Sequence, residues 1–169
     1  MKRIFLIVLS IISFELVSHA QIAFVDTRYI LNKMPSYRDS VAKINQLGII
    51  WQKEIDDKQI ILDKMVNDFE RDEVMLSDSI KKDRSNDLYY HQKEVCDLQR
   101  MRFGYQGDLF KKKQELLKPI EDSVNNVVKQ TAARLNYKIV LDKSQGITVM
   151  FANPKLDITD EVLKDLGMQ

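Results

Sequence analysis

Residues 41–76, VAKINQLGIIWQKEIDDKQIILDKMVNDFERDEVML, decide the fold of this chain. Apolar residues recur through them in alternating steps of three and four, the spacing of a coiled-coil helix. The positions of this seam are Val41, Ile44, Gly48, Trp51, Ile55, Lys58, Leu62, Met65, Phe69, Asp72 and Leu76. All but Lys58 and Asp72 suit burial, whereas the residues between them are mostly polar or charged. Such a helix needs a partner along its seam, because it is not stable alone in water.

The partner helix is predicted to follow a turn at Leu76-Ser77-Asp78-Ser79. These serine and aspartate side chains offer hydrogen bonds that cap helix ends. A chain that folds back near residue 77 turns a second set of apolar residues toward the first helix. This set is Ile80, Leu88, Val95, Leu98, Tyr105 and Leu109. We therefore expect a helical hairpin with arms from Ser36 to Asp72 and from Ser79 onward, each roughly 57 Å long for about 38 residues.

Glycines occur at one level of both predicted arms. Gly48 lies opposite a position between Gly104 and Gly107 when the chain is folded at residue 77. Glycine pairs are a known cause of helix kinks and also allow close backbone approach. Gly48, Gly104 and Gly107 are therefore candidates for a hinge, and a simple packing irregularity explains them equally well. Asp108 is expected to restart the helix after this interruption.

The two ends of the mature chain predict a small α+β body. Strands are expected at residues 22–26, 137–142 and 147–151, the last two joined by a hairpin turn at residues 143–146. Asp26 should cap a short helix before Pro35, and Thr159 should cap a final helix that ends at Gly167. The fold class is thus α+β and mostly α, with a body at residues 21–35 and 137–169 and a hairpin at residues 36–136.

A body of roughly 60 residues forms only a marginal core, so we expect it to associate with other copies. The residues that we expect to carry this oligomerisation all lie in the predicted strands. They are Ile22, Phe24, Ile139, Leu141, Val149 and Phe151.

The first twenty residues resemble a secretory signal peptide. Lys2 and Arg3 precede an apolar run from Ile4 to Val17, and small side chains at Ser18 and Ala20 precede Gln21. A membrane anchor is the weaker interpretation, because the run is shorter than the roughly 20 residues needed to cross a bilayer and contains Glu15. Cleavage after Ala20 would place the mature protein in the periplasm.

The mature chain is electrically neutral and offers no catalytic pattern. The full sequence has 26 Lys and Arg against 25 Asp and Glu, and loss of Lys2, Arg3 and Glu15 leaves 24 of each sign. No net field draws nucleic acid. His91 and Cys96 are the only mature histidine and cysteine, so neither a disulfide framework nor a cysteine-clustered zinc site is expected. Cys96 is expected to be a partly buried helix residue, and we predict no enzyme activity, cofactor or metal.

Several stretches of the mature chain together resemble the Skp/OmpH-like family of periplasmic chaperones. They are Ile22 to Asp26, Tyr29-Ile30-Leu31, Met34-Pro35, Gly107 to Lys112, Leu141 to Ser144, Ala152-Asn153-Pro154 and Asp157 to Leu163. The resemblance implies a trimer with a shared β-core, whose hairpins surround a cavity that holds unfolded outer-membrane proteins without ATP. Some relatives are strongly basic, whereas this mature chain is neutral, so binding of lipopolysaccharide or anionic lipid is not carried over.

Candidate client contacts lie near the hairpin tip. They are Met65, Phe69, Met75 and Leu76, of which Phe69 and Leu76 fit the seam so well that hairpin packing is their favoured explanation. Met75 lies off the seam and is the better contact candidate, since methionine adapts to irregular surfaces. The alternative function is a structural or adaptor protein of the cell envelope, whose hairpin docks on one defined partner.

Overall fold

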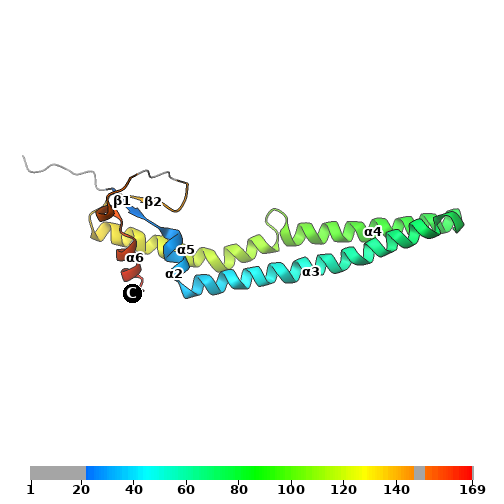
Figure 1. The fold of residues 1–169 in the computed structure, drawn as a ribbon, viewed down its shortest axis with the longest axis horizontal. Coiled ribbons are helices and arrows are strands. Elements are labelled where there is room, and N and C mark those ends of the chain that lie inside the picture. The colour runs from blue at the N-terminus through cyan, green and yellow to red at the C-terminus, as the bar shows by residue number, and fades with distance from the viewer. Residues whose placement is uncertain (1–21, 147–150, 169) are drawn as a thin grey trace, which may run out of the picture. The chain divides into compact units, whose positions relative to one another are not determined.

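The computed structural model describes residues 22–146 and 151–168. These residues form two compact units, one of Met34–Glu121 and the other of the chain up to Lys33 and from Asp122 onward. We call them the hairpin unit and the body unit. Helix α5 (Asp108–Arg134) contributes residues to both. Figure 1 shows the order of the elements along the chain.

The hairpin unit consists of long helices, as predicted. Helix α3 (Pro35–Asp72) is followed by the short 3-10 helix η2 (Glu73–Met75), and helix α4 (Asp78–Phe103) returns along α3 (Figure 1). Pro35 occupies the first turn of α3, where its missing N–H costs no helical hydrogen bond. Ser77 precedes α4 as predicted, but its side chain makes no capping hydrogen bond. Instead, the Ser77 carbonyl accepts a hydrogen bond from the backbone N–H of Lys81 at 2.9 Å.

The predicted seam is buried in the middle of the hairpin. Ile55 and Leu62 of α3 pack with Val95 and Leu98 of α4, and Val66 and Leu88 extend this cluster. Two of the residues expected to face α3 are instead exposed, Ile80 by 47% and Tyr105 by 95%. Ile80 lies in the first turn of α4, and Tyr105 lies in the loop that separates α4 from α5. The heptad pattern therefore fails where regular helix begins or ends.

The body unit contains a two-stranded parallel sheet in the part that the structure describes. Strand β1 (Ile22–Val25) pairs with β2 (Ile139–Asp142), with Ile22 opposite Ile139 and Phe24 opposite Leu141. Residues 147–150 of the third predicted strand, Val149 among them, lie outside the described residues, and Phe151 has no strand geometry. Phe24 also forms an isolated parallel bridge with Asp157.

Short helices complete the body core. They are α2 (Thr27–Lys33), the 3-10 helix η3 (Pro154–Leu156) and α6 (Thr159–Asp165). Ala23, Val25, Ile30, Val124, Ile158 and Val162 are buried there. Asp26 caps α2 as predicted, accepting a hydrogen bond from the Tyr29 N–H at 2.8 Å. The residue before α6 is Ile158 rather than Thr159, and Gly167 follows α6 with a positive φ of 73°.

Candidate functional site

The first candidate site is the hairpin surface, which is held in register by ion pairs between the arms. Lys58 of α3 pairs with Glu94 of α4 at 2.7 Å, and Asp72 pairs with Arg84 at 3.3 Å. Both pairs join residues almost equally distant from residues 76–78, so the turn lies at the predicted place. The Lys58 hydrogen bond and charge lower the pKa of Glu94. These exposed pairs fix the register of the arms more than they stabilise the hairpin.

Arg102 contacts three side chains of the hairpin unit at once. Its guanidinium donates hydrogen bonds to the Glu54 carboxylate at 3.1 Å and to the Asp108 carboxylate at 2.7 Å. It also lies 5.0 Å from the centroid of the Trp51 ring, a cation–π contact. The hydrogen bond to Asp108 raises the pKa of Arg102 further. The Arg102 cluster, with Trp51, Glu54 and Asp108, therefore ties α3 to both sides of the interruption between α4 and α5.

The glycines at the interruption are needed by its backbone. A Cβ on Gly104 would lie 2.3 Å from the Arg100 carbonyl oxygen, and one on Gly107 would lie 2.7 Å from the Met101 carbonyl oxygen. The Gly107 N–H donates to the Gly104 carbonyl at 2.9 Å, which closes the loop. Gly48 differs, because nothing lies within 4 Å of its Cβ position. The close backbone approach expected at Gly48 is therefore absent, and whether the three glycines form a hinge stays a prediction.

The predicted client contacts fall into two groups near the turn. Met65 and Phe69 are partly buried and line a cleft of about 330 Å³ together with Leu88. Its rim is charged and consists of Asp68, Arg71, Asp72, Arg84 and Asp87. Leu76 is also partly buried, whereas Met75 is 83% exposed. The structure thus brings Met65 and Phe69 together and leaves Met75 open to solvent.

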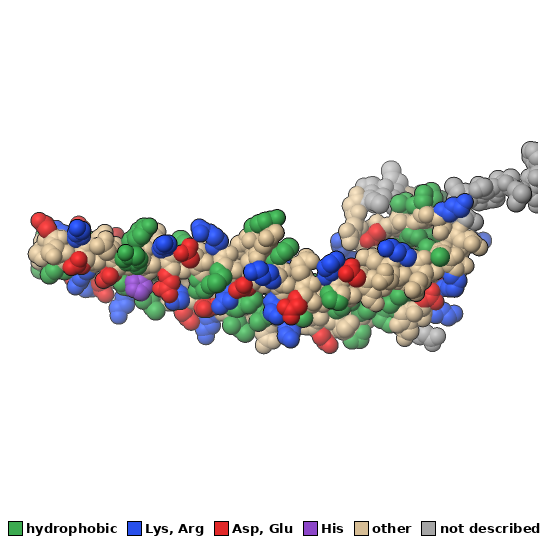
Figure 2. Space-filling view, turned by 180° about the vertical axis from the view of Figure 1, so that it is seen from behind, with side chains coloured by type: hydrophobic (Ala, Val, Ile, Leu, Met, Phe, Trp, Pro, Cys, Tyr) green, Lys and Arg blue, Asp and Glu red, His purple; other side chains and the backbone are tan. Residues whose placement is uncertain are grey.

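Many further apolar side chains of the hairpin unit are exposed. They are Ile49, Ile50, Ile60, Ile61, Val74, Met75, Ile80, Tyr89, Tyr90, Met101, Phe103, Tyr105 and Phe110. Figure 2 shows hydrophobic side chains interspersed with basic and acidic ones along this face of the hairpin. Single exposed apolar residues are ordinary on soluble proteins, but thirteen on a unit this polar form a surface suited to binding apolar chains.

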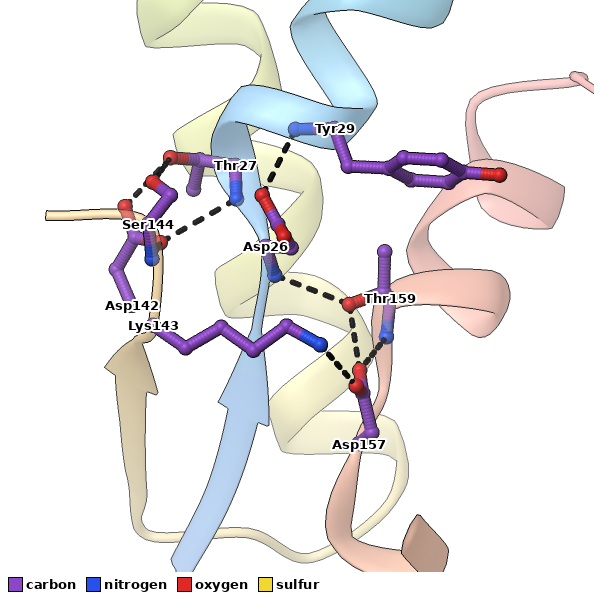
Figure 3. Close-up of polar contacts among 8 residues, drawn as sticks. All are labelled: Asp26, Thr27, Tyr29, Asp142, Lys143, Ser144, Asp157 and Thr159. Carbon is purple, nitrogen blue, oxygen red and sulfur yellow. Dashed lines mark hydrogen bonds and ion pairs between the residues drawn. The ribbon is translucent and has the colours of Figure 1, made fainter. Parts of the chain in front are cut away.

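The second candidate site is a polar network that joins three separated segments of the body unit (Figure 3). The Thr27 hydroxyl donates to Asp142 and lies 3.0 Å from the Ser144 hydroxyl. On the other side of β1, the Asp26 N–H donates to the Thr159 hydroxyl at 3.0 Å. Lys143 donates to Asp157 at 2.6 Å. These contacts join β1, the end of β2 and the start of α6.

Two carboxylates of this network, those of Asp142 and Asp157, are held in the charged form. Burial alone would raise the pKa of Asp142, but hydrogen bonds from Thr27 and Ser144 outweigh burial and lower it. Burial acts in the same way on Asp157, where Lys143 and Thr159 outweigh it and lower the pKa. The hydrogen bond to Asp157 raises the pKa of Lys143. No buried side-chain nitrogen or oxygen of the described residues lacks a hydrogen-bond partner, so the network positions the backbone of the body.

The family of the chain follows from comparison with known proteins. The model of the family described as Outer membrane protein (OmpH-like) matches residues 21–166. The chain belongs to this OmpH-like family. Among solved structures, an OmpH-like candidate outer membrane chaperone from Caulobacter crescentus CB15 is 16% identical, with a TM-score of 0.66 over 88% of this chain and 85% of that one. At this identity the likeness shows a shared fold. A search of curated proteins finds no match.

The sequence stretches that carry the OmpH-like resemblance meet in the polar network of the body. Asp26 ends the first of these stretches, Asp142 and Lys143 lie in another, and Asp157 and Thr159 lie in the last. No periodicity in the sequence predicts contacts between such distant segments. The four strand residues Ile22, Phe24, Ile139 and Leu141 are at most partly buried, while Ala23 and Val25 between them are buried. Within the described residues, the face of the sheet that carries these four side chains is therefore apolar and only partly covered.

The described part of the OmpH-like chain was also compared with the requirements of a metal site and of a membrane span. Within residues 22–146 and 151–168, no three His, Cys, Asp or Glu side chains are placed to hold a metal ion. No helix in these ranges has the length and apolar character of a membrane span. His91 contacts only Glu94, at 3.6 Å, among the ion pairs of these residues. Cys96 was expected to be partly buried but is exposed, because it follows the buried Val95 on α4.

Sequence reasoning missed two features of the hairpin surface. Arg102 was not singled out, although folding the sequence at residue 77 places it beside Trp51. The exposed isoleucine pairs at residues 49–50 and 60–61 were also missed. Their eleven-residue spacing, about three helical turns, was the available signal.

Proposed function

We propose that this OmpH-like protein is an ATP-independent holdase of the periplasm that binds unfolded outer-membrane proteins between the hairpins of a trimer. The observation that carries the proposal is the hairpin surface, on which exposed apolar side chains alternate with charges of both signs (Figure 2). The family match and the predicted signal peptide, which lies outside the described residues, support a periplasmic location.

The physical basis of holding is a large number of weak contacts. A holdase must bind chains of many sequences and release them, so it cannot rely on one tight interface. Tyr89 and Tyr90 are 63% and 67% exposed, and Met75 near the turn is 83% exposed. Such side chains bind apolar segments, and the surrounding charges keep the hairpin soluble. Binding of this kind requires neither a catalytic residue nor a nucleotide.

Trimerisation is supported by the sheet face of the body, which is only partly covered within the described residues. Ile139 is 51% exposed in a strand, next to partly exposed Leu141, Ile22 and Phe24. Three copies that joined these faces would bury apolar area that one small body leaves in water. The three hairpins of such a trimer would provide the client cavity.

An aggregation assay tests the proposed function. A urea-unfolded outer-membrane β-barrel is diluted with and without the mature protein at stoichiometric ratio and without ATP, and light scattering is followed. We expect suppressed scattering, and weaker suppression by Met75→Ser than by the matched variant Ser79→Ala at the same turn. No suppression by the wild type would refute the holdase function.

The second candidate function is an adaptor that docks on one partner. It is favoured by the concentration of exposed apolar residues at the turn, where Val74 is 92% and Met75 83% exposed. Cross-linking in the periplasm distinguishes the two functions. Recovery of a single folded partner, together with no protection of unfolded barrels, would establish the adaptor instead.

A further inference from the structure

Helix α3 has a second apolar face, which is separate from its seam. Ile49, Ile50, Ile60 and Ile61 are 71%, 55%, 65% and 56% exposed. Ile60 lies two positions before the buried Leu62, roughly 200° around the helix. The isoleucine face, as we call these four residues, therefore points away from α4. Nothing in the described part of the chain covers it.

Two charged residues between the isoleucine pairs, Lys53 and Asp57, also have no partner in the described part of the chain. Lys53 and Asp57 are exposed and lie at heptad spacing between Ile50 and Ile60. Neither forms an ion pair or side-chain hydrogen bond within residues 22–146 and 151–168. Their neighbours Gln52 and Asp56, by contrast, are hydrogen-bonded to each other at 2.8 Å. Lys53 and Asp57 are therefore free to pair with charges on another molecule.

The pattern of this face is symmetric about Ile55. An antiparallel copy of α3 centred there places Ile49 opposite Ile61, Ile50 opposite Ile60, and Lys53 opposite Asp57. A two-fold axis repeats each of these pairs, since residue i of one copy meets residue j of the other and the reverse. Apolar residues then face apolar residues, and each cation faces an anion. A second copy of α3 matches this order of isoleucines and charges by symmetry, whereas an unrelated sequence would match it only by coincidence.

We propose that the isoleucine face is a self-association surface, on which α3 of a second copy packs antiparallel with its centre at Ile55. Eight isoleucines and four charges form the contact. This is a small apolar area compared with the roughly 1,600 Å² of a standard stable interface, so the association is reversible and depends on concentration. This association joins two hairpins, so it is separate from any assembly through the body unit. It is also independent of holdase activity.

Charge reversal in the full mature chain tests the pairing. In sedimentation velocity, we expect the wild type to show a concentration-dependent step beyond the assembly that the body forms. Lys53→Asp alone places two acidic residues opposite each other, and Asp57→Lys alone places two basic residues opposite each other. Each variant should raise the dissociation constant of this association about tenfold, which corresponds to about 1.4 kcal/mol. The Asp56→Lys variant on the neighbouring position is the matched control and should retain the step.

Mixing the two charge variants shows whether the pairing is between molecules. A Lys53→Asp chain and an Asp57→Lys chain offer each other two cation–anion contacts, so the mixture should regain the wild-type affinity that neither variant has alone. Ion pairing within one helix, four residues apart, cannot be restored by mixing. Recovery therefore supports the proposal. A mixture that stays as weak as the separate variants overturns it.

Substitution of the isoleucines separates self-association from client binding. Ile50→Ser/Ile60→Ser should abolish the concentration-dependent step, and circular dichroism should show unchanged helix content. If this double variant loses protection of unfolded β-barrels while the step persists, the face binds clients and the proposal is wrong. The absence of any concentration-dependent step in the wild type up to millimolar concentration would also overturn it.

Discussion

The guanidinium of Arg102 lies 5.0 Å from the centroid of the Trp51 ring, which joins the last turn of α4 to α3. The same group bridges Glu54 and Asp108 with hydrogen bonds of 3.1 and 2.7 Å. One side chain therefore connects α3, α4 and α5 at the level where the returning helix is interrupted. Arg102 therefore holds the two arms together at the interruption.

Replacement of Arg102 by alanine should loosen this part of the hairpin. We expect the free energy of unfolding to fall by about 1–2 kcal/mol, the usual magnitude of a partly desolvated cation–π contact combined with charge-assisted hydrogen bonds. Hydrogen exchange of amides near residues 51–54 and 102–108 should accelerate. The control is Arg100→Ala, because Arg100 pairs only with Asp97 in its own helix among the ion pairs of the described residues. Equal effects of the two variants would contradict a special role for Arg102.

The glycines of the hairpin should respond to alanine with opposite signs. Gly48 lies inside α3 with nothing within 4 Å of its Cβ position. Gly48→Ala should therefore stabilise the helix by about 0.5–1 kcal/mol, through helix propensity. Gly104→Ala should destabilise the hairpin, because its Cβ would lie 2.3 Å from the Arg100 carbonyl oxygen. Urea unfolding followed by Trp51 fluorescence measures both changes, and destabilisation by both variants would show that Gly48 has a role beyond helix geometry.

The fold was predictable where it depends on local periodicity. Ile55 and Leu62 follow from the heptad repeat, and Val95 and Leu98 follow from a turn at residue 77. Ile80 and Tyr105 were wrong because a heptad pattern has no meaning at a helix end or in a loop. Gly48 has the spacing of a seam residue, but spacing along the sequence does not determine how closely the two helices approach each other there.

The candidate sites were less predictable than the fold. The contact between Thr27 and Asp142 joins residues 115 positions apart, and no pattern within either segment requires it. The exposed isoleucines were missed because a search for one buried seam treats the opposite face as solvent-facing. The eleven-residue spacing of the isoleucines does not determine whether another element covers them, and the packed structure shows that they are exposed.

The body unit should lose stability in acid. The folded-state pKa values of Asp142 and Asp157 are lowered, so both carboxylates bind protons less readily in the folded than in the unfolded body. Their contribution to the stability of the body is complete above the pKa of the unfolded state, near 4. It is lost as the pH falls through the lower pKa values of the folded state. NMR-detected urea unfolding of β1 and β2 between pH 6 and pH 2 measures this loss.

Substitution identifies the groups responsible for the acid sensitivity. Asp157→Asn should lower stability at pH 6 and make the remaining stability depend less on pH, since one of the two titrating groups is removed. Asp160→Asn, an exposed position in the first turn of α6, is the matched control and should keep the wild-type dependence. An unchanged pH dependence in Asp157→Asn would show that other carboxylates cause the acid loss.

The body should also lose stability in alkali, because the pKa of Lys143 is raised in the folded state. The contribution of Lys143 to stability is complete below the pKa of the unfolded state and is lost as the pH rises through the pKa of the folded state.

The sheet face of the body provides the last prediction, which concerns the proposed trimer. Ile139 is 51% exposed, so Ile139→Asp adds a charge to the face without placing it in the core of one body. A charge buried between copies is costly, and the trimer should dissociate to monomers in sedimentation equilibrium at micromolar concentration. Phe110→Asp is the control, because Phe110 is 46% exposed but lies on α5 in the hairpin unit. If both variants and the wild type sediment alike, the sheet face is not the trimer interface, and if the wild type is itself a monomer, the proposed cavity between three hairpins does not exist.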